Sequence, residues 1–237
     1  DYSKENLGLE PLPDVDFNIR AGNTLVGYVT KKQIDEIAGM FVTEEHRKKI
    51  LEQCDVVARV FERYKEIQLN GGEDYNEFKK AKDDLNIRLK NLTDDLDKVC
   101  YVDMYNGDEK VIQKDLTKVD KKIVCAFYKW RETHKPFHWF AEFYEILNGN
   151  GGFDVVIGNP PYQEKTEGTS DNPVYHLFMQ EAYKLADKVC LITPARFLFD
   201  AGKTPKLWNQ QMLNDPHLKV TFYEQDSSKV FPDSVQI

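Results

Sequence analysis

The amino-acid sequence predicts an α/β fold in which a doubly wound sheet is interrupted by a long α-helical insertion. After residue 150, apolar runs typical of strands alternate with an amphipathic helix, which is the pattern of a sheet covered by helices. Before that, two long stretches carry apolar residues every three or four positions and predict a pair of helices. A third observation indicates where the chemistry lies, because the unusual tetrapeptide Asn159-Pro160-Pro161-Tyr162 directly follows a predicted strand.

Length and composition limit the possible classes of protein. The chain has 237 residues, 41% of them hydrophobic and 30% charged, so it can bury a core and is neither disordered nor collagen-like. No apolar run approaches the roughly 18–20 residues of a membrane span, and no secretion signal opens the chain, so we expect a soluble protein with no membrane partner. The net charge of −8 is opposite to that of a dedicated nucleic-acid-binding domain. Any grip on phosphates must therefore come from a local patch or from elsewhere.

The cysteines give no sign of a metal site. Cys54, Cys100, Cys125 and Cys190 are widely spaced, with no CxxC pair and no histidine at ligand spacing. We therefore expect no metal. Without a secretion signal, reduced thiols in a cytoplasmic protein are the expected state.

One strand and three helices are predicted before residue 135. Val15 to Arg20 is the strand, because prolines precede it and Gly22-Asn23 ends it. Thr43 to Asn70 is a helix capped by Thr43, and a second helix follows Gly71-Gly72, so the two predict an antiparallel hairpin. Its charged outer faces suit either an arm that binds a partner or DNA, or a simple solvated surface. A third helix is predicted from about Lys114 to Thr133.

An aromatic segment begins after Lys135-Pro136 and is most simply explained as core packing. A glycine-rich turn then leads into Phe153–Gly158, whose continuous β-branched run predicts a buried parallel strand. A helix from Val174 to Ala186 follows. Further strands are predicted at Val189–Thr193 and near Lys219–Tyr223.

The residue types of the tetrapeptide suit a flat ring that carries an amino group. The Asn159 amide oxygen and the Pro160 carbonyl are acceptors held by a stiff two-proline turn. Two acceptors directed at one NH₂ group draw its hydrogens out of the ring plane and make the nitrogen a better nucleophile. The Tyr162 ring offers a stacking surface worth roughly 1–3 kcal/mol. The alternative is a rigid strand-to-loop turn with a buried Asn.

The sequence around the tetrapeptide resembles a known family. Phe153 to Tyr162, FDVVIGNPPY, is similar to the catalytic motif of methyltransferases that act on the exocyclic nitrogen of adenine in DNA. The approach to it, which includes Phe137-His138-Trp139 and Gly151-Gly152, resembles that of the Eco57I-like, type IIG restriction–modification methylases. One departure is Tyr144, where that group often has Pro.

Three further segments extend the resemblance to residues 14–28 and to about residues 135–237. Leu191 to Phe197 is similar to the strand and loop that follow the family's catalytic motif. Val230-Phe231-Pro232 looks like a later motif whose aromatic residue stacks on the flipped base. Ile19 to Leu25 resembles a strand-three element in which an Asp or Asn contacts the methyl donor, and Asn23 falls there.

This resemblance implies methyl transfer from S-adenosylmethionine to the N6 amino group of an adenine in double-stranded DNA. Asn159 and Pro160 would hold the amine, while Tyr162 and Phe231 would stack on the two faces of a base that leaves the duplex. Asn23 would contact the donor. Asn23 also suits a turn, and Phe231 also suits a core, so both roles have a simpler alternative.

The resemblance also implies a domain organisation. Residues 1–28 would be a methyltransferase core segment, 29–134 a helical insertion, and 135–237 the catalytic core, truncated at both ends, of a partial Rossmann-like sheet. The family's Gly-rich donor loop does not occur in this sequence. We therefore expect a central fragment that is inactive alone, and an exposed sheet edge that favours self-association.

Two other functions stay open at this stage. The same tetrapeptide serves methylases of RNA amino groups and of protein glutamine, because these substrates also present a planar amine or amide. A non-catalytic interaction fragment is the other alternative, in which the helical hairpin is the working part; the net charge of −8 mildly favours it.

Overall fold

The computed structural model of the protein describes residues 17–37, 42–69, 75–112, 115–149, 151–164 and 172–231. They divide into two compact units. The first, which we call the helical unit, comprises Asp1–Asp154 and Tyr183–Asp187; the second, which we call the sheet unit, comprises Val155–Ala182 and Lys188–Ile237. The predicted boundary at residue 135 lies inside the helical unit, and the three-part domain organisation stays a prediction.

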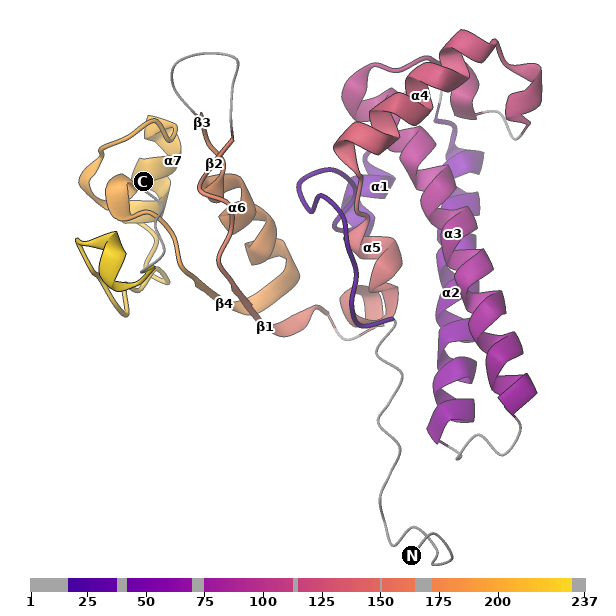
Figure 1. Cartoon of the computed structure of the whole chain (residues 1–237), viewed down its shortest axis with the longest axis horizontal. Coiled ribbons are helices and arrows are strands. Elements are labelled where there is room, and N and C mark those ends of the chain that lie inside the picture. The colour runs from indigo at the N-terminus through magenta and orange to yellow at the C-terminus, as the bar shows by residue number, and fades with distance from the viewer. Residues whose placement is uncertain are drawn as a thin grey trace, which may run out of the picture. The chain divides into compact units, whose positions relative to one another are not determined.

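A helical hairpin is the largest feature of the helical unit. Helices α2 (Glu44–Leu69) and α3 (Tyr75–Tyr105) lie side by side, as Figure 1 shows. The Thr43 hydroxyl accepts a hydrogen bond from the His46 backbone N–H at 3.3 Å, which confirms the predicted cap. Apolar side chains of both helices join one buried cluster: Ile50, Cys54, Val57 and Tyr64 from α2, and Leu85, Leu89, Leu92, Leu96 and Val99 from α3. The predicted hairpin is therefore confirmed, while its Gly71-Gly72 turn lies outside the described residues.

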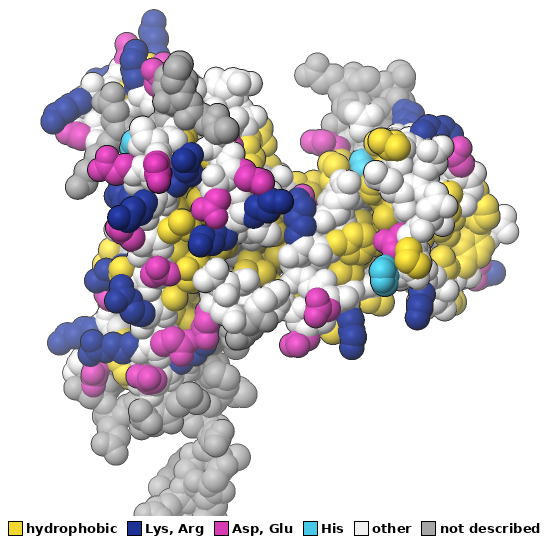
Figure 2. All heavy atoms as spheres, turned by 180° about the vertical axis from the view of Figure 1, so that it is seen from behind, with side chains coloured by type: hydrophobic (Ala, Val, Ile, Leu, Met, Phe, Trp, Pro, Cys, Tyr) yellow, Lys and Arg dark blue, Asp and Glu magenta, His cyan; other side chains and the backbone are white. Residues whose placement is uncertain are grey.

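Charges of both signs are interspersed over the face of the helical unit that Figure 2 shows. Some of them pair along or between the helices, such as Arg88 with Asp84 at 2.9 Å and Arg63 with Glu77 at 3.7 Å. A mixed pattern with local ion pairs is typical of a solvated helix face. It favours the simpler of the two interpretations of the hairpin's outer surface.

The third predicted helix is shorter than expected. Helix α4 covers Lys121–His134, and a separate 3-10 turn, Leu116–Lys118, precedes it. The physical reason is local capping: the Asp115 side chain accepts from the Thr117 N–H at 3.1 Å, and the Asp120 side chain accepts from the Lys122 N–H at 2.8 Å. Each carboxylate begins a new turn, so the two turns do not merge into one helix. Lys114 lies outside the described residues.

The predicted strand at Val15–Arg20 is wrong over its described part, because residues 17–20 form no strand. Phe17 instead packs edge-on against Tyr64 of α2, with ring centroids 5.1 Å apart. The backbone that follows pairs with the aromatic segment, since the Asn23 N–H donates to the Lys135 carbonyl at 2.7 Å. It then leads into the short helix α1 (Lys31–Asp35). Val15 and Asp16 lie outside the described residues.

The tetrapeptide Asn159 to Tyr162 directly follows a strand of a short parallel sheet. Strands β1 (Phe153–Gly158) and β4 (Ala186–Leu191) form a two-stranded sheet, and helix α6 (Tyr175–Leu185) connects them. The Ile192 N–H donates to the Gly158 carbonyl at 3.0 Å, so the carboxyl ends of the strands meet and the strands run in the same direction. Strands β2 (Gln163–Glu164) and β3 (Asn172–Pro173) form a small antiparallel ribbon.

The predictions after residue 150 are confirmed for the position of the first strand and for the helix, and need three corrections. Strand β1 is not buried as predicted, since Val155 is 46% exposed and Ile157 80%, because the described residues do not cover both faces of this two-stranded sheet. The second strand begins earlier than the predicted Val189, because it follows α6 without an intervening loop. No strand is present at Lys219–Tyr223, where the Val220 and Phe222 side chains are exposed. A strand needs a neighbour to pair with, and the described residues supply none there. The wider doubly wound sheet therefore stays a prediction.

Each unit has a core of its own. The helical unit buries an extensive cluster that includes Tyr28 and Phe140 as well as the hairpin residues. The sheet unit has a small cluster that joins α6, the 3-10 turn Ala195–Phe199 and helix α7 (Lys206–Leu213): Tyr175, Met179, Phe197, Trp208 and Met212. Among the helices that the structure describes, none combines the length and apolar character that a membrane crossing requires.

Candidate active site

The tetrapeptide forms the turn that leaves the carboxyl end of β1. Asn159 follows the last residue of the strand and is exposed, while Pro160 is buried beneath the turn. Pro161 is exposed and Tyr162 is half-buried. The structure thus brings the four predicted residues together on one turn, at the edge of the sheet where α/β proteins bind their ligands.

Backbone hydrogen bonds fix both sides of this turn. Before it, the Gly158 carbonyl accepts from the Ile192 N–H at 3.0 Å; after it, the Tyr162 carbonyl accepts from the Val174 N–H at 3.1 Å. A Cβ atom on Gly158 would lie 3.3 Å from Leu191 Cδ2, so the two strands approach closely at this point. The backbone of the turn is therefore anchored to the residue after β4 and to the residue before α6.

The Tyr162 side chain is suited to stacking because its hydroxyl stays neutral. Burial raises the pKa of that hydroxyl above its ordinary value, so no phenolate forms near neutral pH. A neutral ring that is half in solvent can receive a planar base on its exposed side. This arrangement is compatible with the predicted stacking role, which no contact in the structure tests.

A second anchored loop lies at the same edge, after β4. In the 3-10 turn Ala195–Phe199, the Phe197 side chain is buried and packs on Trp208, with ring centroids 5.2 Å apart. The chain then turns at Asp200, whose φ of 52° is left-handed. A polar network holds this turn: the Thr204 hydroxyl donates to Asn209 Oδ1 at 2.7 Å, and Asn209 Nδ2 donates to Asp200 Oδ1 at 3.1 Å.

Sequence reasoning missed this network. Thr204 and Asn209 are both buried, and their spacing of five residues shows no recognisable periodicity. The hydrogen bonds from Lys206 and Asn209 lower the pKa of the Asp200 carboxyl, which keeps it charged as an acceptor. The only local signal was the turn-forming stretch from Asp200 to Pro205. It predicts a loop but gives no indication of the contacts inside that loop.

The other predicted site residues lie apart from the turn in the chain. Asn23 belongs to the helical unit, where its Oδ1 atom accepts from the Leu25 N–H at 3.2 Å and its backbone pairs with Pro136. The turn role weighed for Asn23 therefore has a visible partner, and its role toward a methyl donor stays a prediction. Phe231 is half-buried near the end of the described sheet unit, and its N–H donates to the Ser227 carbonyl at 2.9 Å. Its stacking role is likewise untested.

The thiols are placed in two environments. Cys54 and Cys100 are buried in the hairpin, where burial raises the pKa of each thiol to about 12, while Cys125 and Cys190 are exposed. Within the part of the chain that the structure describes, no group of His, Cys, Asp and Glu side chains is arranged to hold a metal ion.

Comparison with known proteins connects this geometry to a family. The profile of the Eco57I restriction-modification methylases matches residues 72–231, which include the second helix of the hairpin and the whole described sheet unit. A protein of Methanocaldococcus jannaschii, named as a type II restriction enzyme and methyltransferase, is 29% identical over 219 residues. That match covers 74% of this chain and 18% of the relative, so the chain spans less than a fifth of its relative's length. No solved structure matches the chain.

Proposed function

Since the chain belongs to the Eco57I restriction–modification methylase family, we propose that it carries the catalytic segment of an adenine-specific DNA methyltransferase. The proposed reaction transfers the methyl group of S-adenosylmethionine to N6 of an adenine. The single observation that carries the proposal is the anchored turn Asn159 to Tyr162, which presents an exposed amide at the carboxyl end of a parallel strand.

The chemistry that this chain supplies is the preparation of the nucleophile. Asn159 Oδ1 and the Pro160 carbonyl would each accept one hydrogen of the amine and so localise the lone pair on nitrogen. Because the turn is fixed on both sides, these acceptors need little reorganisation when the reaction occurs. When bound, S-adenosylmethionine supplies an electrophilic methyl group on a sulfonium.

The substrate base would enter the site from double-stranded DNA. A base inside a duplex cannot reach an acceptor pair on a strand end, so the adenine must leave the stack, at a cost of a few kcal/mol. We propose that Tyr162 and Phe231 offset this cost by stacking on its two faces. For the methyl donor, Asn23 is the candidate that this chain offers. Its Oδ1 is already held by the Leu25 N–H, so Nδ2 is the group that would donate to the donor's adenine.

We propose further that this segment works within a larger enzyme that acts in the cytoplasm. The chain's net charge of −8 is unsuited to gripping phosphates, so the main DNA contacts are assigned to other parts of that enzyme. In this assignment, different parts of the enzyme determine DNA affinity and methyl transfer. Phosphate contacts would set DNA affinity, while the Asn159 turn would act on one base.

The test is Asn159→Ala in the full-length methylase. We expect methyl transfer to duplex DNA to fall by about 10²–10³-fold, the loss typical of removing one preorganised polar contact to the reacting group. DNA affinity should stay nearly unchanged. The matched control is Asn214→Ala, which removes an exposed asparagine in the same unit, where its side chain bonds only to the Gln210 carbonyl among the contacts seen.

The assay is run in parallel on duplex DNA, tRNA and a glutamine-containing peptide. Methylation of tRNA or of the peptide instead of DNA would replace the proposed substrate. Full methylation of DNA by Asn159→Ala would contradict the proposed role of the turn. No methylation of any substrate by the wild-type enzyme would favour the non-catalytic alternative.

A further inference from the structure

The residues that lead into β1 are held by the helical hairpin through polar side chains. We call residues 135–149 the approach segment. His138 Nε2 lies 2.9 Å from Asp97 Oδ1 of α3. The Tyr144 hydroxyl donates to Asp55 of α2 at 2.5 Å, and Glu145 pairs with Lys65 of α2 at 2.7 Å. The hairpin therefore contacts the approach segment at several points along its length.

The Asp97–His138 contact is the buried one. Asp97 is 3% exposed and His138 is 1% exposed, whereas the Tyr144–Asp55 contact is open to solvent. The Tyr28 backbone N–H donates to His138 Nδ1 at 3.2 Å. Because Nδ1 acts as an acceptor, the ring proton sits on Nε2 and is donated to Asp97. Both ring nitrogens of His138 are thus engaged in hydrogen bonds.

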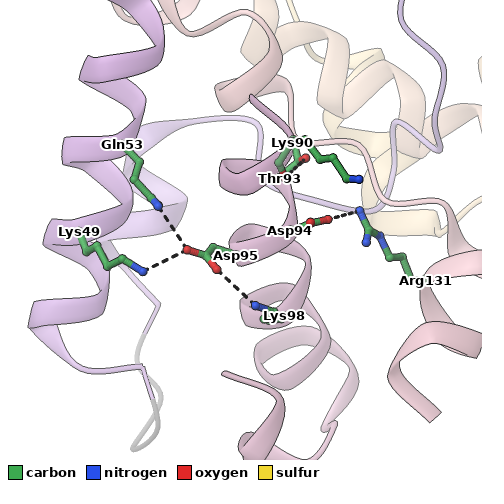
Figure 3. A network of polar contacts seen from close by, with 8 residues as sticks. All are labelled: Lys49, Gln53, Lys90, Thr93, Asp94, Asp95, Lys98 and Arg131. Atoms are coloured by element: carbon green, nitrogen blue, oxygen red, sulfur yellow. Dashed lines mark hydrogen bonds and ion pairs between the residues drawn. The ribbon is translucent and has the colours of Figure 1, made fainter. Parts of the chain in front are cut away.

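Asp97 is in turn held by α4. Its second oxygen pairs with Arg131 Nε at 2.7 Å, and the same guanidinium reaches Asp94 at 2.5 Å. Figure 3 shows this reach, with Arg131 extending from its helix toward Asp94 on α3. A buried carboxylate with two charged or polar partners has little freedom to move. The histidine is therefore tied to α3 through Asp97 and, by way of Asp97, to α4.

The backbone of residues 22–28 closes over the other side of the histidine. The Tyr28 ring stacks on the His138 ring with centroids 5.6 Å apart and planes at 19°. Gly27 has a φ of +136°, and a Cβ atom there would clash with the Phe137 carbonyl oxygen. Only a glycine permits this approach. His138 is consequently buried between the Tyr28 ring and the backbone at Gly27.

From His138 a short chain of contacts reaches the first residue of β1. Trp139, the next residue, packs edge-on against Phe153 at 6.2 Å, and Phe143 does so at 5.4 Å. The Gly152 N–H donates to the Ile146 carbonyl at 3.0 Å. The start of the catalytic strand is therefore tied to the approach segment by ring packing and by a backbone hydrogen bond.

We propose that Asp97 and His138 are positioning residues that hold Phe153, the first residue of β1, and thereby the strand that ends next to Asn159. The proposal rests on the function proposed above. A strand is inextensible, so a slip of one residue at Phe153 would displace Asn159 by about 3.3 Å and turn its side chain to the opposite face. A misplacement of about 1 Å can already cost a hundredfold in rate.

Three variants of the full-length methylase test this role. His138→Asn keeps an acceptor for the Tyr28 N–H and loses the bond to Asp97, whereas His138→Gln keeps a donor toward Asp97. Asp97→Ala removes the partner itself. The matched control is Asp95→Ala on the same helix, whose carboxylate pairs with Lys49 and Lys98 and makes no contact with the approach segment among the described interactions.

We expect His138→Asn and Asp97→Ala to slow single-turnover methyl transfer by about 10- to 100-fold with unchanged KM for DNA and for S-adenosylmethionine. His138→Gln should recover much of the rate, and Asp95→Ala should keep all of it. Amide hydrogen exchange should rise at residues 152–158 in the two slow variants and not in the control. All measurements are made on protein shown to be folded by circular dichroism.

The outcomes separate this proposal from the function on which it rests. Wild-type rates in folded His138→Asn and Asp97→Ala would overturn it. A rise in exchange spread over α2, α3 and α4 as much as over residues 152–158 would also overturn it, because that would indicate general destabilisation. Exchange is read without substrate, so a rise confined to residues 152–158 would support the positioning role even if duplex DNA proved not to be the substrate.

Discussion

The helical unit and the sheet unit differ in how well each buries its own side chains. In the helical unit, Tyr28 and Leu92 are fully buried within one extensive cluster. In the sheet unit, β1 exposes Val155 at 46% and Ile157 at 80%, although a continuous apolar run of this kind is typical of a strand covered on both faces. Two strands and one helix bury too little to form a stable sheet layer alone.

The comparison teaches where stability and chemistry reside in this segment of the methylase. The tetrapeptide lies in the unit with the smaller core, while the larger core belongs to the helical unit, which carries none of the proposed acceptors. A well-packed helical unit and a sheet unit with a small core make sense together if the helical unit holds the strand on which the proposed site depends. Substitutions in each unit test this difference.

The largest expected difference in the free energy of unfolding is between the variants Leu92→Ala in α3 and Ile157→Thr in β1. Leu92 is 0% exposed, so its truncation leaves a cavity and should lower the free energy of unfolding by about 2–5 kcal/mol. Ile157 is 80% exposed, and its substitution should change that free energy by about 0.5 kcal/mol or less. Urea titrations of the 237-residue chain, followed by circular dichroism, measure both. Equal losses of unfolding free energy in the two variants would contradict the difference in burial between the two units.

The next prediction compares two variants of Tyr162 by their methylation activity and not by their stability. Tyr162→Ala removes the proposed stacking surface and should weaken productive binding of the flipped base by about 1–3 kcal/mol, which appears as a lower kcat/KM for methylation. Tyr162→Phe keeps the ring and should stay near wild type, because the proposed role needs no hydroxyl. If the Phe variant were as impaired as the Ala variant, the hydroxyl and not the ring would be the working group.

Periodicity in the sequence was enough to predict the helical hairpin and the tetrapeptide's place after a strand. Both depend on local information, since a 3.6-residue stripe and a strand followed by Pro-Pro are visible within a short window. The predicted strands at Val15–Arg20 and Lys219–Tyr223 show the limit of that information. Apolar β-branched runs report a propensity, but a strand also needs a neighbour to pair with, and no short window contains it.

The buried polar contacts could not be predicted from the sequence, for a related reason. His138 and its partner Asp97 are separated by 41 residues, and Asp97 looks like any other acid on a charged helix. What distinguishes it from Asp95, two residues earlier, is that Asp97 is buried and is held by Arg131 of α4 and by His138. Only the tertiary structure shows which of the two carboxylates is enclosed.

The smallest predicted effect is the contribution of Asp95 to stability and its dependence on pH. Burial raises the pKa of Asp95, but the hydrogen bond from Lys49, the charges of Lys49 and Lys98 and a bond from Gln53 outweigh it, so the pKa is lowered overall. Figure 3 shows these contacts around Asp95. A lowered pKa means that the folded state favours the charged form. The resulting stability is present above the ordinary pKa of an Asp and is lost as pH falls through the lowered value.

Asp95→Asn should therefore lower the free energy of unfolding by about 0.2–1 kcal/mol at pH 7, the range of partly exposed ion pairs, and the difference from wild type should shrink as the pH falls below about 4. The control Asp84→Asn removes the same charge from α3 at an exposed pair with Arg88, where about 0.2–0.5 kcal/mol is expected. Urea titrations at pH 7 and at pH 3 give both differences. A gap between Asp95→Asn and wild type that is undiminished at pH 3 would show that the Asp95 contribution comes from packing and not from its charge.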